Sequence, residues 1–397
     1  MTRERRHALE AWAAAVVSAI VRRLPRPVVL AIGRGLGRIW AALDRRHLRI
    51  AAENLQLAFP DWDEARVRTT AIGVYSHFAA VLLEILWMEG RPVEELLALT
   101  EIEGLEHLKA ALARGRGVVC PIAHLGNWEL QGVATPPLVG SSAVIARPLD
   151  NPALDKRLVS FRTSTGNVVI YKQKALAQIL KTLREGRLVA IMLDQNVQAK
   201  DGIFVRFFGR PACTTTVAAA LAIKTGCPIV PARCARRADG RYRMAYGPLV
   251  EWPGSGRRDE DIAALTQHLT SIIEGWVRET PEQWLWLHRR WKTTPSLETF
   301  PSLETSSAPG LEGSTVSSAS VSGPVSVPDP ASGSDPASRS VPAGVPGPAS
   351  VPDPGSVPGP SPGSDPPSRS GPAVVSAPAP GPGTAPPARS DTPEGRA

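Results

Sequence analysis

Blocks of apolar residues alternate along this chain with blocks of mixed polarity, and from about residue 100 to 295 they predict strands that lead into helices. Residues 117–123 (GVVCPIA) are a short apolar run with β-branched side chains, typical of a buried strand. Further strands are predicted at residues 141–147, 167–171, 187–194, 228–236 and 242–250, and helices at 105–114, 127–134, 151–166, 174–185, 216–226 and 259–279. This order predicts an α/β fold, a single layered domain with a largely parallel sheet flanked by helices.

The N-terminal part combines apolar and basic residues in a helical pattern. Residues 11–21 (AWAAAVVSAIV) are mostly apolar, yet eleven residues are about half of what a membrane-spanning helix needs. Residues 28–50 are amphipathic, with apolar positions at helical spacing beside arginines. The apolar positions are Val29, Ile32, Leu36, Ile39 and Leu43. We predict basic, apolar helices that lie in the face of a bilayer, and the alternative is an ordinary helix hairpin facing the core.

Two further segments are predicted from their local pattern. A long helix is expected to run from a cap at Asp61 or Asp63 to about Trp87. Its buried side is expected to carry Val67, Ile72, Tyr75, Phe78, Leu82 and Leu86. Residues 204–212 (FVRFFGRPA) are expected to form a loop.

Composition divides this chain of 397 residues near residue 295. From Ser296 onward the sequence is rich in Pro, Ser, Gly, Ala and Val, and short segments such as PSLET and VPDP recur. Such repeats cannot bury enough apolar surface to offset chain entropy, so residues 296–397 are predicted to be a disordered and functionally passive tail. The predicted organisation is therefore a membrane-associated helical region at 1–45, a globular domain at 46–295 and this tail.

The charge of the chain is concentrated in the part before the tail. The whole chain carries +8, and the tail carries −5, which leaves +13 in residues 1–295. This suits an anionic partner such as a membrane surface, a phosphorylated lipid or an acidic carrier protein. Nucleic acid is not expected as a partner, because no aromatic and basic reading surface is recognisable. The four cysteines show neither zinc-ligand spacing nor a disulfide framework and are expected to be reduced.

Candidate chemistry lies where the first predicted strand of this region ends. Residues 124–126 are predicted to form a turn, with Asn127 as the N-cap of the following helix. If His124 lies in that turn and Glu129 in the first helical turn, the glutamate leans back and reaches the imidazole. The result would be a histidine base oriented by a carboxylate. The alternative is a histidine satisfied inside the fold and a glutamate stabilised by the helix dipole.

Two other polar residues follow predicted strands in the same way. Arg147 comes at the end of the strand 141–147, and Asp194 at the end of the strand 187–194. Ligands of parallel sheets gather at the carboxyl ends of the strands. The shared position of His124, Arg147 and Asp194 therefore favours a functional site over unrelated core residues.

Several motifs occur in a fixed order along the chain. They are DRRHLRIAAENLQLAFP, the HX₄E pair His124 and Glu129, ARPLDNPALD, the region of Arg162, LDQN, FFGRPA and PEQWLWLHRRWKT. Together they resemble the bacterial lipid A biosynthesis acyltransferases, the late lauroyl and myristoyl transferases. The resemblance covers about residues 1–295, and the tail has no recognisable counterpart.

This resemblance implies transfer of a fatty acyl chain from acyl carrier protein to a hydroxyl of a lipid A precursor, in lipopolysaccharide biosynthesis at the cytoplasmic face of the inner membrane. Residues 46–295 would then be the acyltransferase domain, with no cofactor and no metal. Similar HX₄D and HX₄E pairs occur in the wider glycerolphosphate acyltransferase superfamily, where the histidine is the general base. By that similarity His124 takes the proton of the acceptor hydroxyl while Glu129 fixes its tautomer.

The same resemblance suggests residues that bind substrate. Arg162 and Asp194 match positions where an arginine and an aspartate line the family's site. We expect Arg162 and Arg147 to bind substrate phosphates or stabilise the thioester oxygen, with Asp194 and Gln195 as further substrate-binding residues. The alternative for each arginine is a structural ion pair, which for Arg162 includes a pair with Asp194 itself. The alternative for Asp194 is that it orders a backbone N–H of a loop.

Other functions remain open at this stage. The acceptor could be a phosphatidylinositol mannoside or another glycolipid, although LDQN favours the lipid A branch, and the protein could instead be a catalytically silent lipid-binding protein. A metal hydrolase that uses His124, Glu129 and Asp194 matches no usual zinc pattern. Trp284 and Trp286 of the closing motif suit either an interfacial anchor or a packed core.

Overall fold

A four-stranded parallel sheet forms the centre of the molecule. The computed structural model describes residues 2–171 and 175–295, which belong to one compact unit, residues 1–311. The strand order is β2 (Val118–Ile122), β5 (Leu188–Met192), β3 (Ser142–Ala146) and β4 (Asn167–Tyr171). Every neighbouring pair in this sheet is parallel, so the predicted α/β fold with a largely parallel sheet is confirmed. The predicted tail, 296–397, lies outside the described residues.

A second sheet continues from the edge of the first. It consists of β1 (Thr100–Glu103), β9 (Tyr242–Tyr246) and β8 (Ala232–Arg236), with β1 parallel and β8 antiparallel to β9. A bridge pairs Val119 of β2 with Ile229, which precedes β8. A second bridge pairs Gly126 with Cys234 of β8, so β8 lies beside the predicted turn at residues 124–126.

A β-hairpin occupies the segment that was expected to be a loop. Strand β6 (Ile203–Phe207) pairs with β7 (Arg210–Thr214) in antiparallel register. The two turn residues, Phe208 and Gly209, both have positive φ, 53° and 71°, which is typical of the tightest hairpin turns. Phenylalanine rarely adopts this conformation, so FG lacks the sequence signature of such a turn and the loop prediction was wrong.

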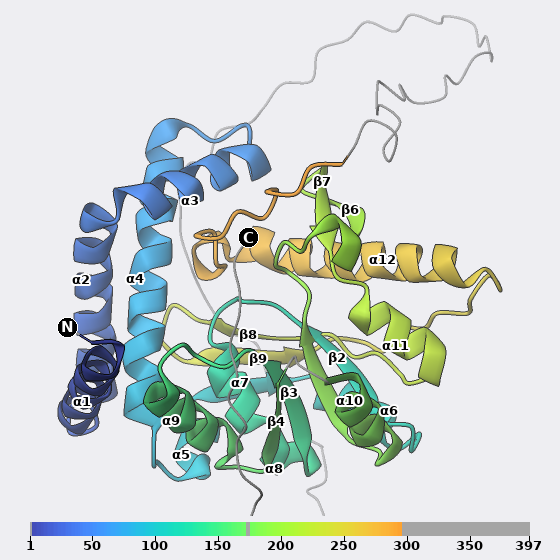
Figure 1. Cartoon of the computed structure of the whole chain (residues 1–397), viewed down its shortest axis with the longest axis horizontal. Helices are drawn as coiled ribbons and strands as arrows, with labels where there is room; N and C mark the ends of the chain where they lie inside the picture. Colours follow the sequence, from blue (N-terminus) through green and yellow to red (C-terminus); the bar gives the residue numbers. More distant parts are fainter. Residues whose placement is uncertain (1, 172–174, 296–397) are drawn as a thin grey trace, which may run out of the picture. The chain divides into compact units, whose positions relative to one another are not determined.

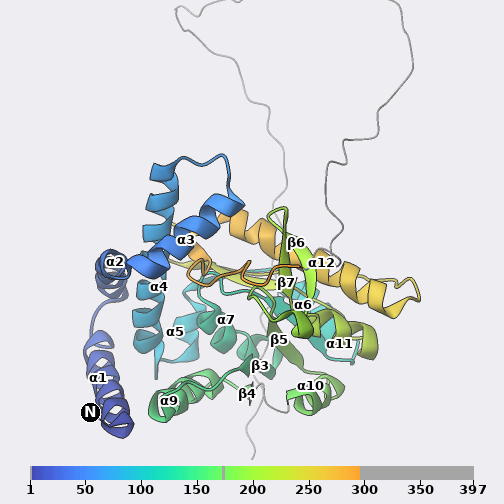
Figure 2. The ribbon, with the colours of Figure 1, turned by 45° about the horizontal axis from the view of Figure 1, so that its top comes forward.

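Helices surround the sheets. They are α1 (Arg3–Val21), α2 (Arg26–Leu43), α3 (Arg45–Ala58), α4 (Glu64–Met88), α5 (Val93–Leu97), α6 (Leu105–Leu112), α7 (Trp128–Ala134), α8 (Pro136–Val139), α9 (Pro152–Thr163), α10 (Ala175–Arg184), α11 (Val217–Thr225) and α12 (Arg258–Glu279), with short 3₁₀ turns η1 (Ala199–Asp201) and η2 (Pro281–Gln283). Figures 1 and 2 show α1, α2 and α4 together at one edge of the sheets, while α12 crosses over them.

Helix α4 is the long helix that the sequence predicted. Its N-cap is Asp63, whose carboxylate accepts the backbone N–H of Arg66 at 2.7 Å. By length and composition α4 could cross a membrane, but 56% of that apolar window is buried inside the protein. The predicted buried side was wrong at Leu82, which is 55% exposed, whereas the neighbouring Glu84 is fully buried.

Helices α2 and α4 pack closely because glycines line their contact. A Cβ atom at Gly37 would lie 2.5 Å from the Cα of Ser76, and one at Gly33 would lie 2.5 Å from the Cα of Ala80. Both distances are far below van der Waals contact. The spacing of these glycines by four residues puts them on one helical face, so α2 is fixed against α4 over a full turn.

Gly37→Ala is expected to destabilise the protein by roughly 1–3 kcal/mol, because the added methyl group must force α2 away from the α4 backbone. The matched control is Gly35→Ala, where nothing lies within 4 Å of the added atom. That control should be neutral or stabilise by up to about 1 kcal/mol, since alanine favours the helix. Urea unfolding followed by tryptophan fluorescence measures both. Equal stability of the two variants would contradict the close packing.

Candidate active site

The pairing of β2 with β5 brings His124 and Asp194 together. Ile122 is in register with Met192, so the residues two positions further along each strand reach the same level at the carboxyl edge of the sheet. The Asp194 carboxylate accepts the backbone N–H of His124 at 2.8 Å and contacts His124 Nδ1 at 2.9 Å. Two of the residues predicted at strand ends are therefore in direct contact.

The Asp194 carboxylate is buried and ionised. It also accepts the indole N–H of Trp284 at 2.8 Å. Burial raises the pKa of Asp194, but the charge and hydrogen bonds of His124 outweigh it and hold that pKa well below its usual range. An ionised carboxylate can only accept, so the neutral form of His124 carries its proton on Nδ1 and its lone pair on Nε2.

The same contact sets the pKa of the histidine. Burial alone lowers the pKa of His124, and the charge and hydrogen bond of Asp194 raise it. A smaller raising effect comes from Glu129, and Arg162 opposes it. The net result is a pKa above the ordinary value of 6.5.

Among the described residues no hydrogen bond joins Glu129 to His124, which corrects the direct contact predicted from the HX₄E spacing. Its carboxylate accepts Arg162 Nε at 2.8 Å and Arg162 Nη2, and it also accepts the indole N–H of Trp128 at 3.1 Å. Glu129 lies in the first turn of α7 and Arg162 in the last turn of α9, so their ion pair links these two helices. Arg162 is thus ion-paired with Glu129 and not with Asp194.

Arg147 and Gln195 lie away from this cluster. The Arg147 side chain is 85% exposed and approaches Asp150 at 4.0 Å. Gln195 is exposed, and its backbone carbonyl accepts Arg290 Nη1 at 3.4 Å. Within residues 2–171 and 175–295, no hydrogen bond joins either side chain to His124 or Asp194, so their substrate-binding roles stay predictions.

Aromatic side chains border the imidazole. The His124 side chain is 16% exposed, and its ring meets that of Trp128 edge to face with centroids 5.1 Å apart. Phe78 of α4 packs against Trp128, with ring centroids 5.8 Å apart. In the described part of the chain, no cluster of three His, Cys, Asp or Glu residues could hold a metal ion.

Several residues that fix the loop carrying His124 were missed by sequence reasoning. Gly126 has φ 65°, and a Cβ atom there would lie 1.9 Å from the carbonyl oxygen of Cys234. Its N–H binds the carbonyl of Gln283 at 2.9 Å, and the N–H of Leu285 binds the carbonyl of His124 at 3.1 Å. The closing motif PEQWLWLHRRWKT contains Gln283 and Leu285, but its sequence does not indicate that their backbones bind the loop at residues 124–126.

The burial of Trp284 and Trp286 decides between the two interpretations of this motif, an interfacial anchor or a packed core. Both are fully buried, and their rings meet edge to face with centroids 4.6 Å apart. They belong to the core, and the interfacial-anchor interpretation was wrong for them.

A largely buried histidine paired with a buried carboxylate at the strand ends of a parallel sheet is an arrangement that acid–base chemistry requires. Comparison with known families identifies the class of enzyme. The chain belongs to the bacterial lipid A biosynthesis acyltransferase family, whose sequence model matches residues 1–293. It is therefore an acyltransferase, as its motifs predicted.

Individual relatives agree with this membership. The lipid A biosynthesis lauroyltransferase of Escherichia coli K12 is 29% identical over 290 residues, which are 72% of this chain and 92% of that protein. The lipid A biosynthesis palmitoleoyltransferase of the same organism is 28% identical over 280 residues, 70% and 89% of the two chains. A phosphatidylinositol mannoside acyltransferase of Mycobacterium tuberculosis is 30% identical over 194 residues, 48% and 59% of the two chains. The family thus acylates lipid A or related glycolipids.

The pKa of His124 is expected to lie above 6.5 and to fall in Asp194→Asn, because the raising charge is removed while burial, which lowers it, remains. NMR titration of protein labelled at histidine Cε1 measures this, with His124→Gln to assign the signal. His77 provides an internal reference, since burial lowers its pKa to about 3. A native His124 pKa below 6.5, or one unchanged in Asp194→Asn, would contradict the assignment of Asp194 as its partner.

Proposed function

We propose that this protein transfers a fatty acyl chain from acyl carrier protein to a hydroxyl of a lipid A precursor, with His124 as the general base. The observation that carries the proposal is the contact between His124 Nδ1 and the buried Asp194 carboxylate, at 2.9 Å. It fixes the tautomer that leaves Nε2 free to accept a proton. An alcohol needs such a base, because its own pKa is near 16, whereas a thioester is already activated.

The proposed reaction is a direct transfer. The acceptor oxygen attacks the thioester carbonyl carbon while His124 Nε2 takes the hydroxyl proton, and Asp194 stabilises the imidazolium that forms. The C–S bond then breaks, and the carrier thiolate receives the proton from the imidazolium. Atoms and charges balance without a covalent acyl-enzyme.

Arg162 is suited to hold negative charge next to this base. Its Nε and Nη2 are bound to Glu129, and among the described residues Nη1 has no hydrogen-bond partner. A guanidinium held on one side by a carboxylate can present its remaining N–H groups to a phosphate or to the thioester oxygen. We therefore assign Glu129 to positioning Arg162 and Arg162 to substrate.

Apolar side chains lie beside the base. Trp128 meets the His124 ring, Phe78 of α4 packs against Trp128, and the exposed Leu82 lies one turn further along α4. A fatty chain that packs against the exposed parts of these side chains would be removed from water at about 0.8 kcal/mol for each buried CH₂ group. This arrangement supports an acyl substrate over a small polar one.

The coverage of the relatives supports a lipid A precursor as acceptor. The two Escherichia coli proteins named for lipid A biosynthesis are matched over 89% and 92% of their length, and the mannoside acyltransferase over 59%. A phosphatidylinositol mannoside is the second candidate, because that relative has the highest identity of the three within its matched region.

His124→Ala is expected to reduce kcat/KM by at least about a hundredfold, the lower end of what a general base contributes. The assay supplies an acyl-carrier thioester with a lipid A precursor, or with a phosphatidylinositol mannoside in a parallel arm, and measures release of the carrier thiol. His268→Ala, an exposed histidine of α12, is the matched control and should keep native activity. Undiminished turnover in His124→Ala would overturn the proposed role.

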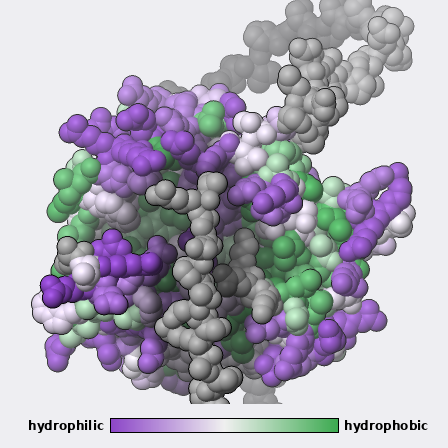
Figure 3. Space-filling view, in the orientation of Figure 1, coloured by the Kyte–Doolittle hydropathy of each residue, from purple (hydrophilic) through white to green (hydrophobic). Residues whose placement is uncertain are grey.

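The N-terminal helices carry the apolar surface that we propose to lie in the cytoplasmic face of the inner membrane. Exposed apolar side chains on α1 and α2 are Leu9, Trp12, Val16, Val17, Ile20, Val28, Ile32, Leu36, Ile39, Trp40 and Leu43. Figure 3 shows hydrophobic side chains at the edge over α2, with hydrophilic ones over α3 and near the start of α1. Apolar burial flanked by basic residues is how amphipathic helices bind anionic bilayers.

Replacing Leu36, Ile39 and Leu43 by serine is expected to weaken sedimentation with anionic lipid vesicles by roughly tenfold or more, because these side chains are 49%, 58% and 79% exposed and would lose burial in lipid. Binding of the native protein should persist at high salt. Leu176→Ser on α10, which is 56% exposed elsewhere on the molecule, is the matched control. Equal loss in the control, or no loss in the triple variant, would contradict the proposed surface.

A further inference from the structure

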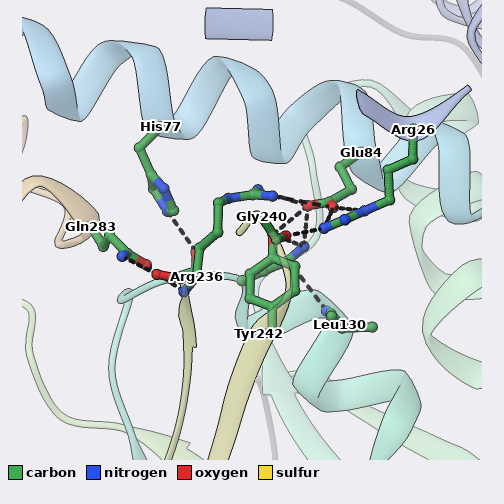
Figure 4. Close-up of polar contacts among 10 residues, drawn as sticks. Arg26, His77, Glu84, Leu130, Arg236, Gly240, Tyr242 and Gln283 are labelled. Carbon is green, nitrogen blue, oxygen red and sulfur yellow. Dashed lines mark hydrogen bonds and ion pairs between the residues drawn. The ribbon is translucent and has the colours of Figure 1, made fainter. Parts of the chain in front are cut away.

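A buried glutamate of α4 collects hydrogen bonds from four different segments. Glu84 is fully buried and accepts Arg26 Nε at 2.7 Å, Arg236 Nη2 at 2.8 Å and the hydroxyl of Tyr242. The side-chain amide of Asn127 donates to the same carboxylate at 3.1 Å. Figure 4 shows the two guanidinium groups reaching Glu84 from its two sides.

The Glu84 carboxylate is ionised in spite of its burial. Burial raises the pKa of Glu84, but the charges of Arg236 and Arg26 outweigh it and lower that pKa. An ionised carboxylate accepts hydrogen bonds and cannot donate them. Every group that faces Glu84 must therefore present a donor.

That requirement fixes the orientation of the Asn127 amide. Its Nδ2 donates to Glu84 and to the hydroxyl oxygen of Tyr242 at 3.2 Å, so its Oδ1 faces the other way and accepts the backbone N–H of Leu130 at 2.9 Å. The contact with Leu130 is the N-cap of α7, the helix that carries Glu129. With the amide reversed, the contacts with Glu84 and Leu130 would be lost.

Helix α4 holds the same loop at a second point. His77 lies about two turns before Glu84, and burial lowers its pKa to about 3, so its imidazole is neutral. Its Nε2 lies 3.0 Å from the carbonyl oxygen of Gly126, to which it donates. Residues 126 and 127, which follow His124, are thus attached to α4 by one neutral and one charged group.

We propose that Glu84 is a positioning residue for the acyl transfer: through Asn127 it sets the loop that carries His124 and the start of α7 that carries Glu129. This inference rests on the proposed function of His124. Glu84 touches neither substrate nor reacting atoms, and its effect is on the geometry of the base. A misplacement of about 1 Å in such a group can reduce a rate about a hundredfold.

A purely structural role makes a different prediction. If the cluster only stabilises the fold, a variant that separates Asn127 from Glu84 while keeping the cap loses stability or nothing, and its kcat is native. Asn127→Ser is such a variant, because serine is an equally good N-cap and its side chain is too short to reach Glu84. The four other donors to Glu84 from Arg26, Arg236 and Tyr242 remain in place.

Asn127→Ser is expected to lower kcat by roughly tenfold or more with KM within twofold and the melting temperature within a few degrees of native. The matched control is Asn151→Ser, since Asn151 caps α9 and its amide donates to Glu10 of α1 at 2.9 Å. That control should keep native kcat. Native kcat in Asn127→Ser, or an equal loss in Asn151→Ser, would overturn the proposal.

A swap of the two groups tests the contact directly. Glu84→Gln and Asn127→Asp are each expected to lower kcat, because one removes the buried charge and the other opposes two carboxylates. The double variant restores one amide and one carboxylate with the native net charge, and should exceed either single variant by about fivefold or more. No recovery would count against the proposal. His124→Ala is run in the same assay. If it retains activity, the proposed function fails. If it is inactive while Asn127→Ser keeps native kcat, only the proposed role of Glu84 fails.

Discussion

The site depends on the hydrogen bonds that the buried carboxylate of Asp194 accepts. This carboxylate accepts the backbone N–H and the imidazole of His124 and the indole N–H of Trp284, so it joins the ends of β2 and β5 to the closing segment of the domain. A buried charge without partners would cost several kcal/mol, and these three donors are what make it tolerable. The same bonds that hold the fold together here also leave Nε2 of His124 free.

Local pattern was sufficient to predict much of the fold. The strand β2 is a run of five buried residues, and such a run shows in the sequence as unbroken apolar character. The convergence of His124 and Asp194 followed from the same reasoning, because parallel strands share one carboxyl edge. The hairpin turn at Phe208 and Gly209 escaped prediction, since it uses a residue that rarely has positive φ.

The sequence placed His124 and Asp194 at one edge of the sheet, but it could not predict that Asp194, and not Glu129, binds the imidazole. Strand β2 pairs with β5 and not with β3, the next strand of that sheet along the chain, and this order is set by long-range packing that local pattern does not contain. The spacing of His124 and Glu129 suggested a direct contact. In the structure a turn separates His124 from Glu129. The Glu129 carboxylate binds Arg162, which lies on α9, a helix distant in sequence. The burial of Glu84 was not predicted, because the two arginines that compensate its charge, Arg26 and Arg236, are far from it in sequence.

The ion pairs of Glu84 argue against a position of α4 inside a membrane. The helix is long and apolar enough to cross a bilayer, but placing it in lipid would strip Glu84 from Arg26 and Arg236 and detach Asn127 from α4. A charged group inside a bilayer is costly, and Glu84 has its charged partners, Arg26 and Arg236, inside the protein. We therefore assign the proposed membrane contact to the exposed apolar side chains of α1 and α2. Because Gly33 and Gly37 hold α2 against α4, that surface and the loop that carries His124 are attached to the same helix.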